Sequence, residues 1–304
     1  MEILSHALIK QGGRKNIEDA ICPKQPSQTS VFVVCDGVGG SNYGEIASEV
    51  AANCFQQLLH QSKKTNKESK FTTLIHKSLV NFKDEIEKFV EENPAAKGTS
   101  TTLTLVSFGK NEAQIAWCGD SRIYHIRNGK IIYKTKDHSL VQDMVDQGIL
   151  TEQEAINHPK KNVITRSLNQ QTKPTDITTS QLKIKTGDWI LQCTDGLLEQ
   201  VSEKHLEEFL TSYKEGFDYS DYFNRICEGK TGDNYSMYLH YVKKGGGASV
   251  GLMVGLILLI IGLAVGGWYY MNNEEAGSTS DTHTPLLQIQ GSKPDSTSKK
   301  GTSK

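Results

Sequence analysis

The sequence predicts an α+β domain in which two packed antiparallel sheets are flanked by helices, followed by one separate apolar helix. Short β-branched or aromatic runs recur over residues 1–243, and they occur in groups rather than alternating singly with helices. Helical periodicity fills the blocks between these groups. An uncharged apolar run, 248–271, comes after the domain. Together these observations predict a β-sandwich of the α-β-β-α type.

Seven segments have the composition of strands. The dipeptide Asn128-Gly129 between two of them predicts a tight hairpin. Short gaps join three of the segments in the middle of the chain, which predicts an antiparallel meander rather than β-α-β units. The predicted strands are 30–36, 101–108, 113–120, 122–127, 130–135, 188–195 and 235–242.

Helical periodicity predicts a long pair, 44–62 and 70–92, inserted between the first of these strands and the meander. Two sheets packed face to face and covered by helices would bury the apolar residues of this region. Shorter helices are predicted at 139–148, 152–158, 203–211 and 217–229.

Composition narrows the functional class. The formal net charge of -1 gives no support for a nucleic-acid binder held by bulk electrostatics. The six cysteines are scattered without a Cys-x-x-Cys pair, which favours reduced thiols over a disulfide framework or a zinc ribbon. The N-terminal residues contain no apolar core of a signal peptide, so we expect the first domain to be cytoplasmic.

The run 248–271 is long enough to span a bilayer, and aromatic residues 268–270 stand where an interfacial belt would lie. Lys243 and Lys244 precede it and two glutamates follow it. By the positive-inside rule this predicts a single-pass protein of the cell membrane, with its N-terminal domain in the cytoplasm. A buried core helix is the alternative.

Residues 244–247 are predicted to be a linker, and the polar tail 272–304 is predicted to be disordered. Small residues repeated every four positions let two membrane helices approach closely, so the glycines predict a homodimer through the span. Glycine is also common in membrane helices in general, which is the alternative. The repeated glycines are 247, 251 and 255, and again 262 and 266.

Aspartates mark several strand ends. Asp36, Asp120 and Asp195 each close a predicted strand, and Asp233 opens the last one. Mg²⁺ and Mn²⁺ prefer carboxylate, carbonyl and water oxygens, and Gly37 lets the backbone approach closely. We therefore expect one shared acidic cleft. An ordinary Asp-Gly turn is the alternative for any one of these positions alone.

A family resemblance covers roughly residues 5–242. The motifs "RKNIEDA", "VCDGVGGSNYGEIAS", "GTSTTLTLV", "CGDSRIYHIRNGKI", "TKDHSLVQDMVDQGILTEQEAINHP", "NVITRSLN", "GDWILQCTDGL" and "GDNYSMYLHYV" resemble, in this order, those of the metal-dependent 2C-type protein phosphatases in their bacterial form. The resemblance implies a β-sandwich with two Mn²⁺ or Mg²⁺ ions at one end. It also implies hydrolysis of phosphoserine and phosphothreonine in proteins, in opposition to a cognate Ser/Thr kinase.

The resemblance also implies roles for residues at the matching positions. Asp36 resembles the carboxylate that bridges both metals, and Gly37 the residue that offers its carbonyl to one of them. Asp195 and Asp233 match further ligands, and Asp120 matches a ligand of a third, weaker ion. Two such ions would activate a water molecule against phosphorus, so no protein nucleophile is needed.

Residues near the N-terminus match the remaining roles. Glu18 and Asp19 resemble the acidic pair that reaches the metals through water, and Arg14 the arginine that holds the substrate phosphate. A guanidinium suits forked contact with phosphoryl oxygens. The segment 139–165 matches the flap beside the cleft.

This chain departs from the family pattern at a few positions. Val38 and Ser41 stand where many relatives have a histidine, so we expect water to protonate the leaving group. His138 is interpreted as structural, and Asn169 replaces a common glycine at the end of the flap. Cys35, Cys118 and Cys193, near the aspartates, are interpreted as thiols of the strand core.

Two rival functions remain open from the sequence. One is a phosphatase of the same fold dedicated to a partner-switching regulator, an anti-sigma antagonist. The other is a membrane scaffold that binds phosphorylated partners without turnover.

Overall fold

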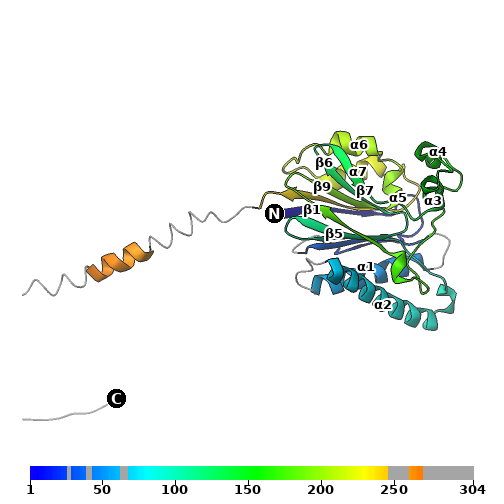
Figure 1. The fold of residues 1–304 in the computed structure, drawn as a ribbon, viewed down its shortest axis with the longest axis horizontal. Helices are drawn as coiled ribbons and strands as arrows, with labels where there is room; N and C mark the ends of the chain where they lie inside the picture. Colours follow the sequence, from blue (N-terminus) through cyan, green and yellow to red (C-terminus); the bar gives the residue numbers. More distant parts are fainter. Residues whose placement is uncertain (26–28, 39–42, 62–67, 246–259, 270–304) are drawn as a thin grey trace, which may run out of the picture. The chain divides into compact units, whose positions relative to one another are not determined.

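The structure is a computed structural model that describes residues 1–25, 29–38, 43–61, 68–245 and 260–269 (Figure 1). The chain divides into two compact units, Met1–Gly246 and Gly247–Lys304. The first unit contains both sheets and the helices that cover them.

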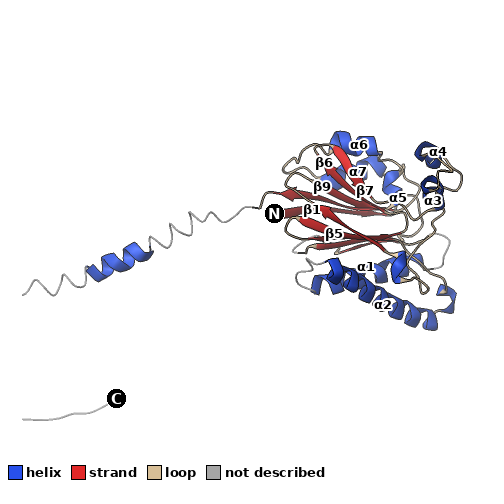
Figure 2. Ribbon diagram, in the orientation of Figure 1, coloured by secondary structure: helices blue, strands red, loops and turns tan. Residues whose placement is uncertain are grey.

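The strands form two antiparallel sheets of five described strands each (Figure 2). This arrangement confirms the predicted β-sandwich. The first sheet has the order β1 (Glu2–Lys10), β10 (Tyr235–Lys243), β9 (Trp189–Cys193), β6 (Arg122–Arg127) and β7 (Lys130–Lys134), and the second has the order β2 (Asp19–Cys22), β3 (Val31–Asp36), β4 (Leu103–Phe108), β5 (Glu112–Cys118) and β8 (Thr178–Lys183).

Helices cover the outer face of each sheet, as the α-β-β-α prediction requires (Figure 1). The long pair α1 (Gly44–Gln61) and α2 (Glu68–Glu92) packs on the second sheet. Three shorter helices, α5 (Asp195–Leu198), α6 (Glu203–Phe209) and α7 (Tyr219–Cys227), pack on the first sheet. The remaining helical segments are α3 (Leu140–Asp146), α4 (Glu152–Ile156), η1 (Pro94–Ala96) and η2 (Pro174–Asp176).

Buried side chains of the described residues form three hydrophobic clusters, one for each contact between layers. Phe55 and Phe82 fill the space between the helix pair and the second sheet. Phe32 and Tyr238 lie between the sheets, and Trp189 lies under α5, α6 and α7. The first unit therefore has a complete hydrophobic core of its own, and we expect residues 1–246 to fold without the rest of the chain.

The predicted meander is wrong at its third strand. β4 and β5 pair as expected, but β6 belongs to the other sheet, where it pairs with β7 and β9. The chain crosses between the sheets at Gly119, whose φ of +103° is unfavourable for other residues. The hairpin at Asn128 and Gly129 is confirmed, and both residues have the positive φ of a tight turn.

Three strands of the structure were not predicted from the sequence. β1 has mostly half-buried residues, β2 has only four residues, and β8 is an edge strand with a single buried side chain. None of them carries the long β-branched or alternating run that identifies a strand in a sequence. Asp195 also differs from prediction, because it begins α5 instead of closing β9.

The predicted span 248–271 lies mostly outside the described residues, and the tail 272–304 lies wholly outside them. Residues 260–269 are helical. Among the described residues, no helix is both long enough and apolar enough to cross a membrane. The proposed pairing of glycines concerns mainly positions that the structure does not describe.

Candidate metal centre

The acidic residues at the ends of β2 and β3 meet at one end of the sandwich. The antiparallel register places Asp19 directly opposite Asp36. The N–H of Gly37 continues this pairing by donating to the carbonyl oxygen of Glu18 at 3.0 Å. The backbone of Asp36 is fixed from the other side, because its N–H donates to Oγ1 of Thr102 at 2.9 Å and its carbonyl accepts from the N–H of Thr102 at 2.8 Å.

Gly37 is required by a close backbone approach. A Cβ at this position would lie 2.6 Å from the carbonyl carbon of Gly44, the first residue of α1, and 2.8 Å from the carbonyl oxygen of Glu18. Both neighbours are main-chain atoms that cannot move aside easily. A glycine after the strand therefore lets helix α1 start directly beside Asp36.

A second close approach joins Asp195 to Asp233. A Cβ on Gly196 would lie 1.9 Å from the carbonyl oxygen of Asn234, so the start of α5 packs backbone to backbone against the residues before β10. Burial, followed by the charge of Asp233, raises the pKa of Asp195. The two aspartates, far apart in the sequence, are therefore electrostatic neighbours.

Asn234 holds the N-terminal loop against the start of β10. Its side-chain amide donates to the carbonyl oxygens of Gln11 at 2.7 Å and Asn16 at 2.9 Å, and its Oδ1 accepts from the N–H of Glu18 at 2.8 Å. The Asn234 side chain is buried. Its three hydrogen bonds position Arg14 and Glu18 at the edge of the acidic cluster.

Arg14 forms a forked ion pair with Asp233. Its Nε and Nη2 donate to the two carboxylate oxygens at 2.7 and 2.5 Å. This hydrogen bonding is the largest cause that raises the pKa of Arg14. The arginine side chain remains 47% exposed, so it lies at the boundary between the acidic residues and solvent.

Asp19 lies deepest in the cluster and is 5% exposed. Oγ1 of Thr194 donates to its Oδ2 at 3.0 Å, whereas its Oδ1 is buried and has no hydrogen-bond partner among the described residues. Burial raises the pKa of Asp19 to about 7, and the charges of Asp195 and Asp233 add to this shift. The hydrogen bond from Thr194 acts in the opposite direction.

The carboxyl groups of Asp19, Asp36, Asp120, Asp195 and Asp233 form one electrostatic unit, here called the carboxylate cluster. Burial raises the pKa of Asp36 well above its usual value, and the charges of the other four members raise it further. The pKa of Asp120 is raised to about 7, first by burial and then by the charge of Asp195. Without a cation, the ionised forms of these groups destabilise one another.

The residues of the cluster fit a hard divalent cation. Oδ1 of Asp195, like Oδ1 of Asp19, is buried without a hydrogen-bond partner in the described part of the chain. A buried, unpaired carboxylate oxygen is costly unless a cation or a donor satisfies it. The donor set consists of oxygen atoms, which suits Mg²⁺ or Mn²⁺.

The side chains are not yet arranged around one ion. Among the described residues, no group of three or more His, Cys, Asp or Glu side chains has the geometry of a metal site. Asp233 gives a physical reason, because both of its oxygens are engaged by Arg14. Binding of a cation by Asp233 would require its carboxylate to rotate away from the guanidinium.

His138 has a structural role, as the sequence predicted. Its Nδ1 accepts from the N–H of Gly119 at 3.2 Å, which leaves Nε2 to donate to Oγ1 of Thr178 at 3.0 Å. Burial lowers its pKa to about 4, so the ring is neutral near pH 7. His138 therefore connects the start of the flap to the turn just before Asp120.

Ion pairing and backbone bonds close the base of the flap. Arg122 donates from Nε and Nη2 to both carboxylate oxygens of Asp137, at 2.8 and 2.7 Å. Ser139 and Ile164 form an isolated bridge between the two ends of the flap. Helices α3 and α4 lie between these anchor points in the chain.

The cysteines near the aspartates are core thiols, as predicted. All six cysteines lie in the described part of the chain and are free. Burial raises the pKa of Cys118 to about 12 and raises the pKa values of Cys35 and Cys193 as well. These thiols are neutral at physiological pH and are poor metal ligands or nucleophiles.

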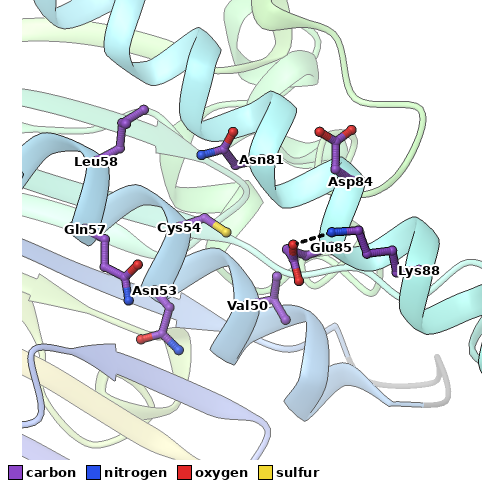
Figure 3. Close-up of a pocket in the computed structure, with 9 residues that line it drawn as sticks. All are labelled: Val50, Asn53, Cys54, Gln57, Leu58, Asn81, Asp84, Glu85 and Lys88. Atoms are coloured by element: carbon purple, nitrogen blue, oxygen red, sulfur yellow. Dashed lines mark hydrogen bonds and ion pairs between the residues drawn. The ribbon is translucent and has the colours of Figure 1, made fainter.

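A groove of about 580 Å³ lies between α1 and α2 and is lined by those two helices (Figure 3). Polar side chains such as Asn53, Gln57 and Asn81 face it, and Glu85 forms an ion pair with Lys88 at 2.9 Å on its wall. Its lining includes none of the carboxylate cluster. The groove is separate from the candidate metal centre.

The structure brings together all eight residues predicted for the site. Val38, one of the departures from the family pattern, follows Gly37 directly, whereas Ser41 lies outside the described residues. Sequence reasoning missed Thr102, Thr194 and Asn234, which position the acidic groups. These residues could have been found from the motifs "GTSTT", "CTDG" and "GDN", because each of the three residues lies within a few positions of a site residue or of a strand that carries one. The predicted site residues are Arg14, Glu18, Asp19, Asp36, Gly37, Asp120, Asp195 and Asp233.

Comparison with known proteins identifies the family of this chain. The family "Protein phosphatase 2C" matches residues 11–233. The serine/threonine phosphatase stp of Listeria innocua is 30% identical over 230 residues, which cover 74% of this chain and 89% of that protein. The solved serine/threonine phosphatase of S. agalactiae is 28% identical with a TM-score of 0.69, and the match covers 80% of this chain and all of that one.

A further solved structure bears on the cofactor. The catalytic domain of the serine/threonine protein phosphatase PstP, solved in complex with two manganese ions, is 27% identical with a TM-score of 0.66, and the match covers 80% of this chain and 99% of that one. The family match spans well over half of this chain. The chain therefore belongs to the protein phosphatase 2C family and is a metal-dependent protein-serine/threonine phosphatase.

Proposed function

We propose that this phosphatase reverses the action of a bacterial-type Ser/Thr kinase at the cytoplasmic face of the cell membrane, with the carboxylate cluster as its metal centre. The observation that carries the proposal is the meeting of five carboxyl groups at one end of the sandwich. Two of these groups have a buried oxygen without a hydrogen-bond partner among the residues that the structure describes. Bound cations would neutralise the buried carboxylates, whose charges are otherwise costly to bury.

The chain offers ligands for two Mn²⁺ or Mg²⁺ ions. Asp36 would contact both ions, and the carbonyl oxygen of Gly37 together with Asp195 and Asp233 would complete the protein ligands. Asp120 would hold a third, weaker ion shared with Asp195. When bound, the ions supply positive charge at the phosphoryl oxygens and an acidified water as nucleophile.

Other residues act on the substrate and on water. Arg14 would exchange its forked contact with Asp233 for a forked contact with two phosphoryl oxygens, since a guanidinium can donate in parallel to two oxygens of either group. Glu18 and Asp19 would accept hydrogen bonds from waters around the ions. Asp19 lies opposite Asp36 in the strand register, so waters held by Asp19 would lie next to the Asp36 carboxylate.

The leaving serine or threonine oxygen needs a proton. His138 cannot deliver it, because both ring nitrogens are engaged and burial lowers the pKa of this histidine to about 4. Val38, which follows the metal-binding turn, has no titratable group. We therefore assign this proton to a water molecule.

Membrane attachment forms part of the proposal. The uncharged run 248–271 has the length and aromatic flank of a single membrane span, with Lys243 and Lys244 on its cytoplasmic side. Its repeated glycines support pairing of two copies in lipid. Fractionation of the full chain with membranes, retained after a carbonate wash and lost on deletion of 248–304, would support this part of the proposal.

The enzyme assignment is tested with the fragment 1–246. We expect Mn²⁺-dependent release of phosphate from p-nitrophenyl phosphate and from phosphothreonine peptides, because neither reaction can proceed without charge neutralisation at phosphorus. Initial rates are measured with Mn²⁺, with Mg²⁺ and after treatment with EDTA. Full activity in excess EDTA would refute the metal assignment, and tight phosphopeptide binding without turnover would favour a scaffold.

Replacement of Arg14 by lysine should raise KM for phosphopeptides by about tenfold or more while changing kcat less, since a point charge replaces the forked contact. The measurement is steady-state kinetics at saturating Mn²⁺. Lys15→Ala provides the matched control, because Lys15 is the exposed neighbour of Arg14. An unchanged KM in Arg14→Lys would remove this arginine from phosphate binding.

A further inference from the structure

The end of the sandwich opposite the carboxylate cluster, here called the distal edge, gathers basic residues. Every strand of the two sheets runs between the cluster end and the distal edge, and neighbouring strands run in opposite directions. β10, for example, starts beside Asp233 and runs to Lys243, which pairs with Glu2 at the start of β1. The distal edge comprises Lys110, Arg127, Lys130, Lys183, Lys185, Lys243 and Lys244.

Hydrogen bonds join these basic residues into one continuous surface across both sheets. Nη2 of Arg127, in the first sheet, donates to the carbonyl oxygen of Lys183 in the second at 3.1 Å. The N–H of Ile184 donates to the carbonyl of Asn111, next to Lys110, at 3.1 Å. The N–H of Gly187 donates to the carbonyl of Val242, next to Lys243, at 2.8 Å.

Ion pairing neutralises only part of this surface. Arg127, Lys130 and Lys243 have carboxylate partners. By contrast, Lys110, Lys183, Lys185 and Lys244 are exposed and form no ion pair in the part of the chain that the structure describes. Glu2 and Glu112 lie on the same edge and also have no ion pair among the described residues. The paired sets are Arg127 with Asp188 (2.7 Å), Lys130 with Glu207 (3.2 Å) and Lys243 with Glu215 (3.9 Å).

We propose that the distal edge rests on an anionic lipid surface, so that the carboxylate cluster faces away from the membrane. This inference rests on the membrane attachment proposed above. The domain ends at Lys243, and the proposed span begins at residue 248, so a linker of four residues reaches at most about 14 Å. The Debye length at physiological salt is about 8 Å, so this reach is less than two Debye lengths. The lysines are therefore close enough to be attracted by anionic headgroups.

The charge distribution selects one orientation of the domain. An anionic surface attracts the distal edge, and the linker leaves the domain from that same side. The metal centre and the flap would then point into the cytoplasm, where a folded phosphoprotein can reach them. The lysines would therefore act on substrate access without touching the substrate.

Vesicle binding of the fragment 1–246 tests the inference without the span. We expect the fragment to sediment with vesicles that contain about 30% phosphatidylglycerol but not with pure phosphatidylcholine, and to dissociate in about 0.5 M NaCl. The variant Lys183→Glu/Lys185→Glu should lower the ratio of bound to free protein by about tenfold or more. Circular dichroism and p-nitrophenyl phosphate turnover verify that this variant is folded.

The matched control is Lys77→Glu/Lys97→Glu, which makes the same change of charge at exposed lysines outside the distal edge. It should retain the ratio of bound to free protein within about twofold. An equal loss in both double variants would overturn the inference, because bulk charge would then explain the binding. Tighter binding to duplex DNA than to the anionic vesicles would also overturn it in favour of a nucleic acid.

These outcomes are separable from those of the proposed function. A fragment that binds anionic vesicles but has no Mn²⁺-dependent activity would refute the phosphatase mechanism and leave the distal edge supported. A full chain that fails to fractionate with membranes would refute the span, whereas the vesicle result on 1–246 would stand.

Discussion

Replacing Asp36 with asparagine should lower kcat/KM for phosphothreonine peptides by about 10³-fold or more, because the amide removes the negative charge with which this residue would hold the proposed metal ions. Asp36 is the member of the cluster whose pKa is raised by all four others, so it lies at their electrostatic centre. Asparagine has nearly the same shape, and the backbone contacts of position 36 to Thr102 do not involve the side chain. The fold should therefore survive the substitution.

The measurement combines steady-state kinetics with Mn²⁺ titration by calorimetry. Asp36→Asn should bind Mn²⁺ much more weakly than the wild type, while its circular dichroism spectrum is unchanged. Asp146→Asn is the matched control, since Asp146 is an exposed flap carboxylate paired with Lys136. Wild-type turnover in Asp36→Asn would remove this residue from the metal centre.

The second large effect concerns stability without metal. In EDTA at pH 8, Asp120→Asn should be more stable than the wild type by about 2 to 4 kcal/mol, since a pKa raised from 3.8 to about 7 corresponds to roughly 4 kcal/mol. For a chain of this size the melting temperature should rise by about 5 to 10 °C. Burial and the charge of Asp195 are the main causes, and asparagine relieves both.

The sign of the pH dependence follows from linkage. Because the folded pKa of Asp120 is raised, the folded state holds its proton more tightly than the unfolded state does. Its contribution to stability is complete below pH about 4, is lost as the pH rises to about 7, and stays lost above that. The advantage of Asp120→Asn should therefore be larger at pH 8 than at pH 5.

Thermal denaturation in EDTA at the two pH values measures this difference. Asp146→Asn again serves as the control. Its effect on stability should have the opposite sign, because hydrogen bonding from Lys136 lowers the pKa of Asp146. Loss of that exposed pair should cost at most about 0.5 kcal/mol. In saturating Mn²⁺ the wild type should gain stability by binding the ion. A pH-independent destabilisation in Asp120→Asn would contradict the electrostatic account.

The comparison of sequence and structure is clearest in the strands. Strands with long β-branched runs, such as β3 and β6, were predicted within one residue of their bounds. β2 and β8 were missed because short or edge strands owe their existence to hydrogen bonds with neighbours rather than to a periodic pattern. β6 was wrongly predicted to belong to a meander for a similar reason. The sheet that it joins depends on the direction of the chain after Gly119, which no local pattern shows.

The class of the domain, the family motifs and the charged residues of the candidate site could be predicted from the amino-acid sequence, because these follow from composition and local order. The folded chain was needed to see that Asp19 lies opposite Asp36, that Arg14 pairs with Asp233, and that Asn234 holds the N-terminal loop in place. These contacts join residues distant in sequence, and their energies come from burial and pairing, which no local pattern encodes.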